Sequence, residues 1–378
     1  MLNKMKATEY LNILFKQWSG SDARTIVPLP LSGSARSYFR LGDEKNTAVG
    51  VYHTNDAENE AFVIFARHFR NLGFQVPEIY LTDLSNHVYL QQDLGESTLF
   101  DLIQKDADDG TSISEKYLRQ TINLLPQIQV AGHQGMDYSA AYPRESFDVQ
   151  SMRWDLNYFK YHFLKFTGLS FNEQKLENDF DEIIRVLNSA PKDFFLYRDF
   201  QTRNIMISND QVWFIDFQGG RRGYPAYDLA SLLFDAKADL SHSLRQSLLD
   251  QYVQRLQSLT DIKPTDFLSM YPGFVLIRKL QAMGAFGFRG IFEQKTHFLQ
   301  SIPFALDNGK WITENYDFPF EFPELGKTAC TTSLANNLSL AKLLSTMVIA
   351  LDNKTLSPFK TPWIYSLASS RFLACNFP

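Results

Sequence analysis

The chain has 378 residues, of which 44% are hydrophobic and 21% are charged, and its net charge is −5. This length predicts two domains or one two-lobed unit. The ordinary balance of apolar and charged residues excludes a mainly disordered chain. An acidic net charge argues against nucleic-acid binding through bulk charge, so we expect no nucleic-acid partner.

Cysteine is scarce, since only Cys330 and Cys375 occur. Two cysteines can form at most one disulfide, which cannot hold together a chain of this size, and their spacing is not that of a zinc site. The longest apolar stretch, 343–351, is about half of the length that a membrane span requires. The first residues carry charges throughout and lack the apolar block of a signal peptide. We therefore expect a cytoplasmic protein with no membrane partner.

The first 92 residues mix helical spacing with strand patterns. Apolar residues at helical spacing predict helices over about 8–18 and 58–70. Apolar runs bounded by turn residues predict strands. These strands are 28–31, 38–41, 48–52, 76–81 and 87–92.

After Gly95 the pattern becomes mostly helical. Helical spacing continues to about residue 285, interrupted by short strands near 194–197, 205–208 and 211–217. We predict an α+β fold with a small β-rich lobe at 1–92 and a larger helical lobe at 93–328. The segment 329–378 shows no sustained period, and its structure is left open.

The stretch from Phe194 to Asp228 carries the chemistry. Two apolar strands there are separated by Asn209 and Asp210, which predicts a hairpin with a two-residue turn. With Ser208 opposite Gln211, Asn204 falls opposite Ile215, next to Asp216. Asp199 enters the same region five residues before Asn204.

This convergence of oxygen-bearing side chains suits phosphoryl transfer. Carboxylate and amide oxygens are typical Mg²⁺ ligands, so Asn204 and Asp216 are the candidate metal ligands. Asp199 is the candidate acceptor for the proton of an attacking hydroxyl. The alternative for either aspartate alone is that it caps a turn, but the combined spacing favours a catalytic site.

The motif Y-R-D-F-Q-T-R-N resembles the catalytic loop of the kinase superfamily, and I-D-F-Q-G-G resembles its metal-binding element. The following Y-D-L-A-S-L-L is similar to the aminoglycoside phosphotransferase and choline kinase family. Within that family, S-A-R-S-Y-F-R and Y-L-Q-Q-D-L-G look most like bacterial kinases of N-acetylmuramate and N-acetylglucosamine. The resemblance covers about 20–305. It implies a bilobal protein-kinase-like fold that uses ATP and Mg²⁺, with Asp228 orienting the catalytic loop.

Two positions depart from the family pattern. Tyr197 replaces the usual catalytic-loop histidine, which is mainly architectural. The phosphate-binding lysine is not visible, because no lysine occurs between Lys45 and Lys105. The helix carboxylate that normally pairs with this lysine would be Glu60.

Another cation must then neutralise the phosphates. Arg36 and Arg40 are the candidates, because guanidinium groups bind phosphate in a bidentate fork. The alternative is that both are solvated strand residues. Backbone groups of the turn near Ser34 could also meet phosphate. The connector 91–94 resembles the family hinge, which makes Gln92 a candidate for contact with the adenine edge.

The sequence gives weaker evidence for the residues that bind the acceptor. Asp155 lies on a predicted helix where the resemblance implies an acidic residue that binds a sugar hydroxyl. Arg221 and Arg289 are candidates for contact with an anionic substrate group. A solvated helix face and surface charge are the structural alternatives for these three residues.

We expect a small-molecule kinase whose substrate is an amino sugar or amino alcohol. Two alternatives stay open. One is a nucleotide-binding pseudokinase or regulatory adaptor, which the missing lysine motivates. The other is an aminoglycoside or choline/ethanolamine kinase. The sequence does not decide between ATP and GTP, and it does not predict the oligomeric state.

Overall fold

The computed structural model describes residues 2–30 and 36–329. Close contacts divide the chain into two compact units. Unit 1 comprises Met1–Phe147, Pro191–Leu233 and Leu240–Pro264. Unit 2 comprises Asp148–Ala190, Phe234–Asp239 and the described part of Thr265–Pro378. The chain is not divided at the connector, so the lobe boundary predicted at residue 92 stays a prediction.

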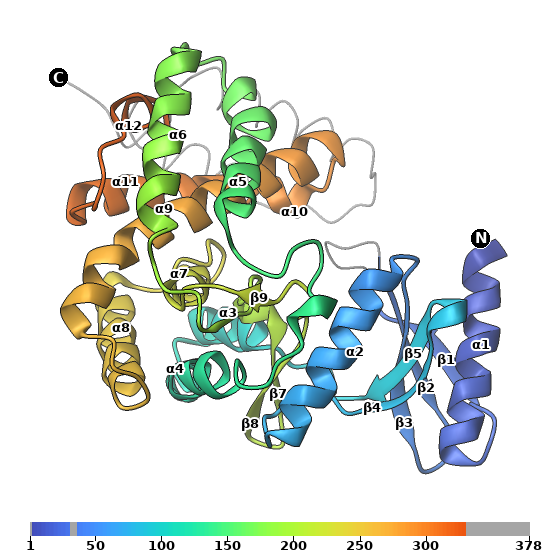
Figure 1. The fold of residues 1–378 in the computed structure, drawn as a ribbon. Coiled ribbons are helices and arrows are strands. Elements are labelled where there is room, and N and C mark those ends of the chain that lie inside the picture. Colours follow the sequence, from blue (N-terminus) through green and yellow to red (C-terminus); the bar gives the residue numbers. More distant parts are fainter. Residues whose placement is uncertain (1, 31–35, 330–378) are drawn as a thin grey trace. The chain divides into compact units, whose positions relative to one another are not determined.

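Unit 1 begins with a helix and an antiparallel sheet of order β1-β2-β3-β5-β4. Helices α1 and α2 lie on opposite faces of this sheet (Figure 1). The mixed composition, with one small sheet and a mostly helical remainder, confirms the predicted α+β class. The bounds are α1 Leu2–Ser19, β1 Thr25–Pro28, β2 Ser37–Gly42, β3 Thr47–Tyr52, α2 Asp56–Asn71, β4 Ile79–Asp83 and β5 Val88–Gln92.

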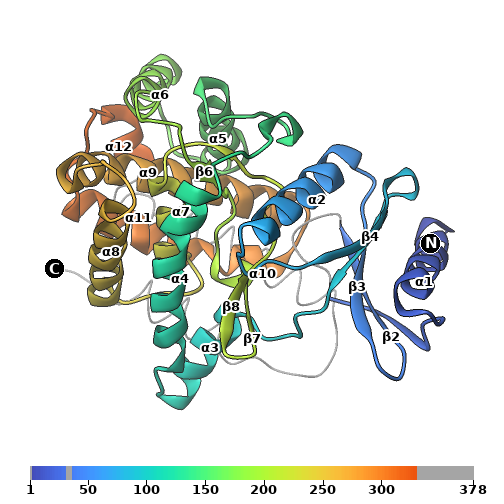
Figure 2. The same cartoon turned by 60° about the horizontal axis from the view of Figure 1, so that its bottom comes forward.

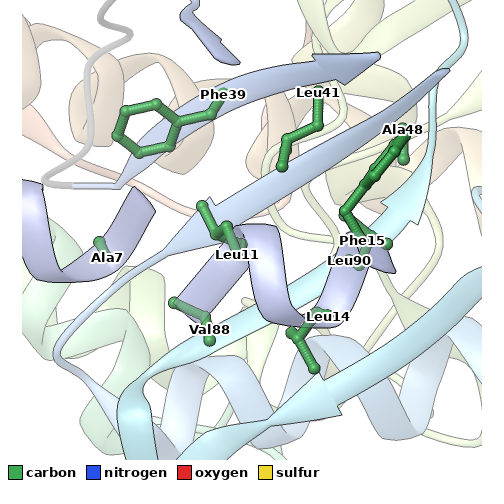
Figure 3. Packing of buried hydrophobic residues seen from close by; sticks show 9 residues of the cluster. All are labelled: Ala7, Leu11, Leu14, Phe15, Phe39, Leu41, Ala48, Val88 and Leu90. Atoms are coloured by element: carbon green, nitrogen blue, oxygen red, sulfur yellow. The ribbon is translucent and has the colours of Figure 1, made fainter. Parts of the chain in front are cut away.

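The face of the sheet toward α1 is a closed apolar core. The apolar stripe of α1, with Leu11 and Phe15, packs against Leu41 of β2 and against Val88 and Leu90 of β5 (Figure 3). All of these side chains are fully buried. Since strand side chains alternate between faces, the neighbours of these residues point to the other face of the sheet.

Gly50 of β3 lies on this core face. A Cβ atom at this position would stand 2.7 Å from Leu11 Cδ2 and 2.8 Å from Leu41 Cδ1. A lysine there would have to enter the apolar core under α1. Gly50 therefore points away from the opposite face of the sheet, where β3 presents Val49 and Val51 and no lysine.

The rest of unit 1 is helical apart from two short ladders. Strand β6 pairs with β9, and β7 pairs with β8. Helix α4 packs beside α8 (Figure 2), where Arg119 donates to Ser247 and Gln251. The bounds are α3 Leu99–Asp109, α4 Ile113–Ala131, β6 Phe195–Leu196, β7 Ile205–Ser208, β8 Gln211–Phe214, β9 Arg221–Arg222, α7 Ala226–Leu233 and α8 His242–Gln257.

Unit 2 is built of helices. Asp179 of α6 accepts hydrogen bonds from the backbone N–H groups of Glu324 and Leu325, and so caps the first turn of α12. A π-helix, Phe288–Phe292, follows α9 directly. The bounds are α5 Val149–His162, α6 Glu173–Leu187, α9 Pro264–Gly287, α10 Thr296–Leu299, α11 Ile302–Asn315 and α12 Pro323–Ala329.

Candidate active site

The predicted hairpin forms as β7 and β8. Ser208 pairs with Gln211, and the turn residues Asn209 and Asp210 have φ of 50° and 60°. Positive φ at both central positions is the turn geometry that matches the twist of the strands. Beyond the ladder, the Ile215 N–H donates to the Asn204 carbonyl over 3.1 Å. The hairpin thus places Asn204 beside the residue that precedes Asp216.

The three predicted oxygen-bearing residues meet at the open end of this hairpin. The Asn204 amide nitrogen donates to the Asp199 carbonyl at 2.8 Å and to the Asp216 carboxylate at 3.3 Å. Because both bonds use the nitrogen, the amide oxygen is the atom of Asn204 that could ligate a cation. Together with the Asp216 carboxylate it forms a hard-oxygen donor pair that suits Mg²⁺.

Asp216 is held in a strained backbone conformation. Its φ is 69°, a left-handed value that costs free energy for a residue other than glycine. Phe217 compensates by anchoring the loop: its buried ring stacks on Phe62 of α2 at 4.7 Å and meets Phe69 edge-on. Strain held by such an anchor is typical of a functional position.

Arg36 delivers the positive charge of the site. Only 1% of its side chain is exposed. One guanidinium nitrogen lies 2.9 Å from Glu58 of α2, and another lies 3.5 Å from Asp216. Arg36 is therefore a buried cation beside the candidate metal ligand, which argues against the alternative of a solvated strand residue.

The helix carboxylate is a correction to the sequence prediction. Glu60 is exposed, and Glu58 makes the ion pair with Arg36. Residues two apart on a helix face away from each other, so only one of the two can reach the site. The sequence spacing could have identified Glu58. It precedes the buried Phe62 and Phe65 by four and seven positions, and so lies on the same side of the helix as they do.

Burial and charge shift the pKa values of this cluster. Burial raises the pKa of Asp216, the Arg36 guanidinium opposes that rise, and the negative charge of Asp199 adds to it. Burial also raises the pKa of Tyr38 to about 12. The phenol of Tyr38 thus stays protonated beside the guanidinium at physiological pH. A bound cation would favour the ionised form of Asp216.

Arg40 does not join this cluster, which corrects its predicted role. Its guanidinium binds Asp93 through two nitrogens at 2.8 and 3.2 Å, pairs with Glu96 and donates to the Gly95 carbonyl. Arg40 therefore clamps the connector to β2. Two carboxylates compensate its charge, which leaves little of it for phosphate.

An apolar cluster lies where the connector leaves β5. Leu94, Met206 and Trp213 are buried together, with Ile215 packed against them. Before it, Gln92 exchanges bonds with Glu78: its backbone N–H donates to the Glu78 carbonyl, and its side chain accepts from the Glu78 N–H. Apolar side chains of this kind are typical of sites that bind purine bases.

Hydrogen bonds to two other segments of unit 1 hold the loop that carries Asp199. The fully buried Asp228 carboxylate accepts the backbone N–H groups of Tyr197 and Arg198 at 2.8 and 2.9 Å. The hydroxyl of Tyr197 donates to the Ile215 carbonyl. Tyr197 thus links the loop that carries Asp199 to the loop that carries Asp216, a role that the sequence did not reveal.

The remaining predicted residues lie elsewhere or outside the described part. Asp155 of α5 and Arg221 of β9 are 4% and 5% exposed, so neither is a solvated surface charge. Arg221 donates to the carbonyls of Gly219 and Tyr142. Arg289 pairs with Glu293 at 3.0 Å. Asp155 and Arg289 belong to unit 2 and Arg221 to unit 1. Ser34 lies outside the described residues.

Metal and membrane features can be searched over residues 2–30 and 36–329. In these ranges no group of three or more His, Cys, Asp or Glu side chains is placed to hold a metal ion. A cation held by one carboxylate, one amide and phosphate oxygens needs no such group. Within the same ranges, no helix is both long and apolar enough to cross a bilayer.

Comparison with known proteins agrees with this geometry. Residues 25–267 match the phosphotransferase enzyme family. The chain belongs to this family. It is therefore a kinase that phosphorylates a hydroxyl group and uses ATP as the phosphoryl donor, and its second substrate is a small molecule.

Two curated relatives match much of the chain. The N-acetylmuramate/N-acetylglucosamine kinase of Neisseria meningitidis is 25% identical, over 64% of this chain and 71% of the relative. The protein of the same name from Pseudomonas putida is 26% identical, over 78% of this chain and 86% of the relative.

Solved structures show the same fold. The complex of gentamicin with APH(2″)-IIa has a TM-score of 0.53 at 15% identity, covering 80% of this chain and 95% of that one. Choline kinase from Cryptosporidium parvum has a TM-score of 0.53 at 12% identity, covering 81% and 99%. These similarities confirm the predicted kinase-like fold.

Proposed function

We propose that this phosphotransferase transfers the γ-phosphoryl group of Mg²⁺-bound ATP to a hydroxyl of an amino sugar. One observation carries the proposal: the hairpin brings Asn204 within 3.3 Å of the Asp216 carboxylate, on the loop that also bears Asp199. The names of the curated relatives support an amino sugar as the acceptor class.

Each residue then has a role. Asp199 accepts the proton of the acceptor hydroxyl as its oxygen bonds to the γ-phosphorus and ADP leaves. Asn204 and Asp216 would hold Mg²⁺, which supplies charge neutralisation on the phosphate oxygens. Arg36, oriented by Glu58, takes the place of the missing lysine on the phosphates. Catalysis comes from positioning and charge, without a covalent intermediate.

Gln92 is proposed to present backbone groups to the adenine edge. Arg221 of unit 1 is a proposed acceptor contact. It is a buried cation, which suits binding of an anionic group rather than a solvated surface. Asp155 and Arg289 belong to unit 2, so their acceptor contacts stay predictions from the resemblance.

The test is ADP release with N-acetylmuramate, N-acetylglucosamine, choline and an aminoglycoside. We expect turnover with at least one amino sugar and none in the Asp199→Asn variant, whose carboxamide cannot accept the proton. Turnover of choline alone would move the acceptor class to amino alcohols. Tight binding of Mg·ATP without turnover of any acceptor would favour the non-catalytic nucleotide binder, which the missing lysine motivates.

A further inference from the structure

Strand β5 separates its side chains onto two faces. Val88 and Leu90 point to α1 and complete the apolar core (Figure 3). The alternation of a strand places Tyr89 and Gln91 on the opposite face. Gln91 therefore shares a face with Tyr89 although it is a polar residue in the middle of a sheet.

This face of the sheet extends from the part of the site near Arg36 to the apolar cluster that contains Leu94. The Tyr89 ring stacks on Phe62 of α2 at 5.5 Å. Burial raises the pKa of its phenol, and the Arg36 guanidinium opposes that rise. Three residues beyond Gln91, Leu94 joins Met206 and Trp213 in the apolar cluster. Gln91 thus lies between the position suited to phosphate and the position suited to a base.

Gln91 also carries an unsatisfied group. The residue is only 8% exposed, and its side-chain Oε1 is buried without a hydrogen-bond partner in the described chain. Buried acceptors are nearly always paired in folded proteins, and an exception calls for an explanation. A carboxamide oxygen here would be satisfied by a donor on a bound molecule.

We propose that the Gln91 carboxamide recognises the 6-position of the purine, with Oε1 accepting from the 6-amino group of adenine. The inference rests on the proposed nucleotide function and adds a base-specificity residue to it. Guanine carries a carbonyl at this position, so two acceptors would face each other unless the amide turned. Gln91 therefore makes the site selective for ATP over GTP.

The experiment measures binding of three Mg²⁺-nucleotides to the full chain by calorimetry: ATP, GTP and purine riboside 5′-triphosphate, which lacks the 6-amino group. Gln91→Leu removes the amide at similar volume. We expect this variant to bind ATP about 10-fold more weakly and purine riboside triphosphate as the unaltered chain does. Retained binding of the latter also shows that the variant is folded.

A second variant tests the direction of the hydrogen bond. Gln91→Glu offers only acceptors when ionised, so we expect it to bind ATP and to discriminate more strongly against GTP. The matched control is Gln17→Leu, an exposed glutamine of α1, which should bind all three nucleotides as the unaltered chain does.

Equal loss of ATP and purine riboside triphosphate in Gln91→Leu would show that the amide acts through packing, and would overturn the inference. Unchanged ATP binding in this variant would overturn it as well. Failure of the unaltered chain to bind any of the three nucleotides would overturn the proposed function itself, and the inference with it.

Discussion

At the scale of single residues, the proposed phosphate site depends on Arg36, which we propose as the substitute for the missing lysine. Arg36 comes from the start of β2, whereas the family lysine belongs to the third strand. On the face of that strand opposite α1, the side chains are the uncharged Val49 and Val51. The replacement keeps the ion pair with the helix carboxylate, because Glu58 accepts from Arg36 at 2.9 Å.

The ion pair gives a prediction with an internal control. Glu58→Gln removes the charge that orients Arg36, so we expect the KM for ATP to rise about 10-fold. Glu60→Gln, on the exposed side of the same helix, should leave this KM unchanged. Steady-state kinetics at saturating acceptor measure both. Equal effects of the two variants would contradict the assignment of Glu58.

Tyr197 gives a second prediction at this scale. Tyr197→Phe deletes the hydroxyl that donates to the Ile215 carbonyl and leaves the buried ring in place. The loop of Asp216 then loses one of its anchors, so we expect kcat to fall about 10-fold and the Mg²⁺ requirement to rise. The control is Tyr80→Phe, which removes the hydroxyl from a ring that stacks on Trp18 of α1. A Tyr197→Phe enzyme with an unchanged Mg²⁺ dependence would show that the histidine replacement is only architectural.

At the scale of elements, patterns within a short segment predicted the features that contacts within that segment determine. The two turn residues Asn209 and Asp210 were sufficient to predict the hairpin and its register, because a two-residue loop leaves one alignment. The stripe of Phe62 and Phe65 was sufficient to predict α2. No separate helix was predicted over α3, because its apolar residues are concentrated in its first half and its second half is mostly acidic; it begins with a capping box at Thr98 and Asp101.

These patterns did not predict which residues far apart in the sequence contact each other. The sequence singled out Arg36 and Arg40 equally, since both follow one turn. Only the fold shows that Asp93 and Glu96 compensate Arg40, whereas Arg36 reaches Asp216. The buried oxygen of Gln91 likewise depends on three strands packed around it.

Helix α4 gives a prediction of pH dependence. Burial opposes ionisation of Asp106, but hydrogen bonds from Ser114, Thr111 and the Ile113 N–H lower its pKa from the ordinary 3.8 to about 2. A lowered folded-state pKa stabilises the fold above pH 3.8, and this contribution is lost as the pH falls toward 2. We expect Asp106→Asn to be less stable than the unaltered chain at pH 7, with the difference shrinking between pH 4 and 2 in urea unfolding. A difference independent of pH would contradict the capping role.

At the scale of the whole molecule, the family match covers the candidate site but not the end of the described chain. Family similarity extends over residues 25–267, which include every residue of the candidate metal and phosphate site in the described chain. Arg289 lies beyond that range. Acceptor residues are therefore harder to predict from the sequence than nucleotide-binding residues. Asp155 and Arg289 lie in helical segments, where the apolar spacing indicates packing and not ligand contact.

Ligand binding to the whole molecule separates the roles of the two aspartates. A nucleotide at about 100 times its Kd stabilises the folded state by about 2.7 kcal/mol, which corresponds to a rise of about 3 °C in the unfolding midpoint of a chain of 378 residues. We expect Mg·ATP to give such a rise in the unaltered chain and in Asp199→Asn, because the proton acceptor is not needed for binding. Asp216→Ala should abolish the Mg²⁺-dependent part, since it deletes the only carboxylate proposed to hold the ion. Asp250→Ala, at an exposed position of α8, is the control for loss of a carboxylate. A full Mg²⁺-dependent rise in Asp216→Ala would show that the ion is held by other groups, and the assignment of the hairpin as a metal site would fail even if the enzyme remained a kinase.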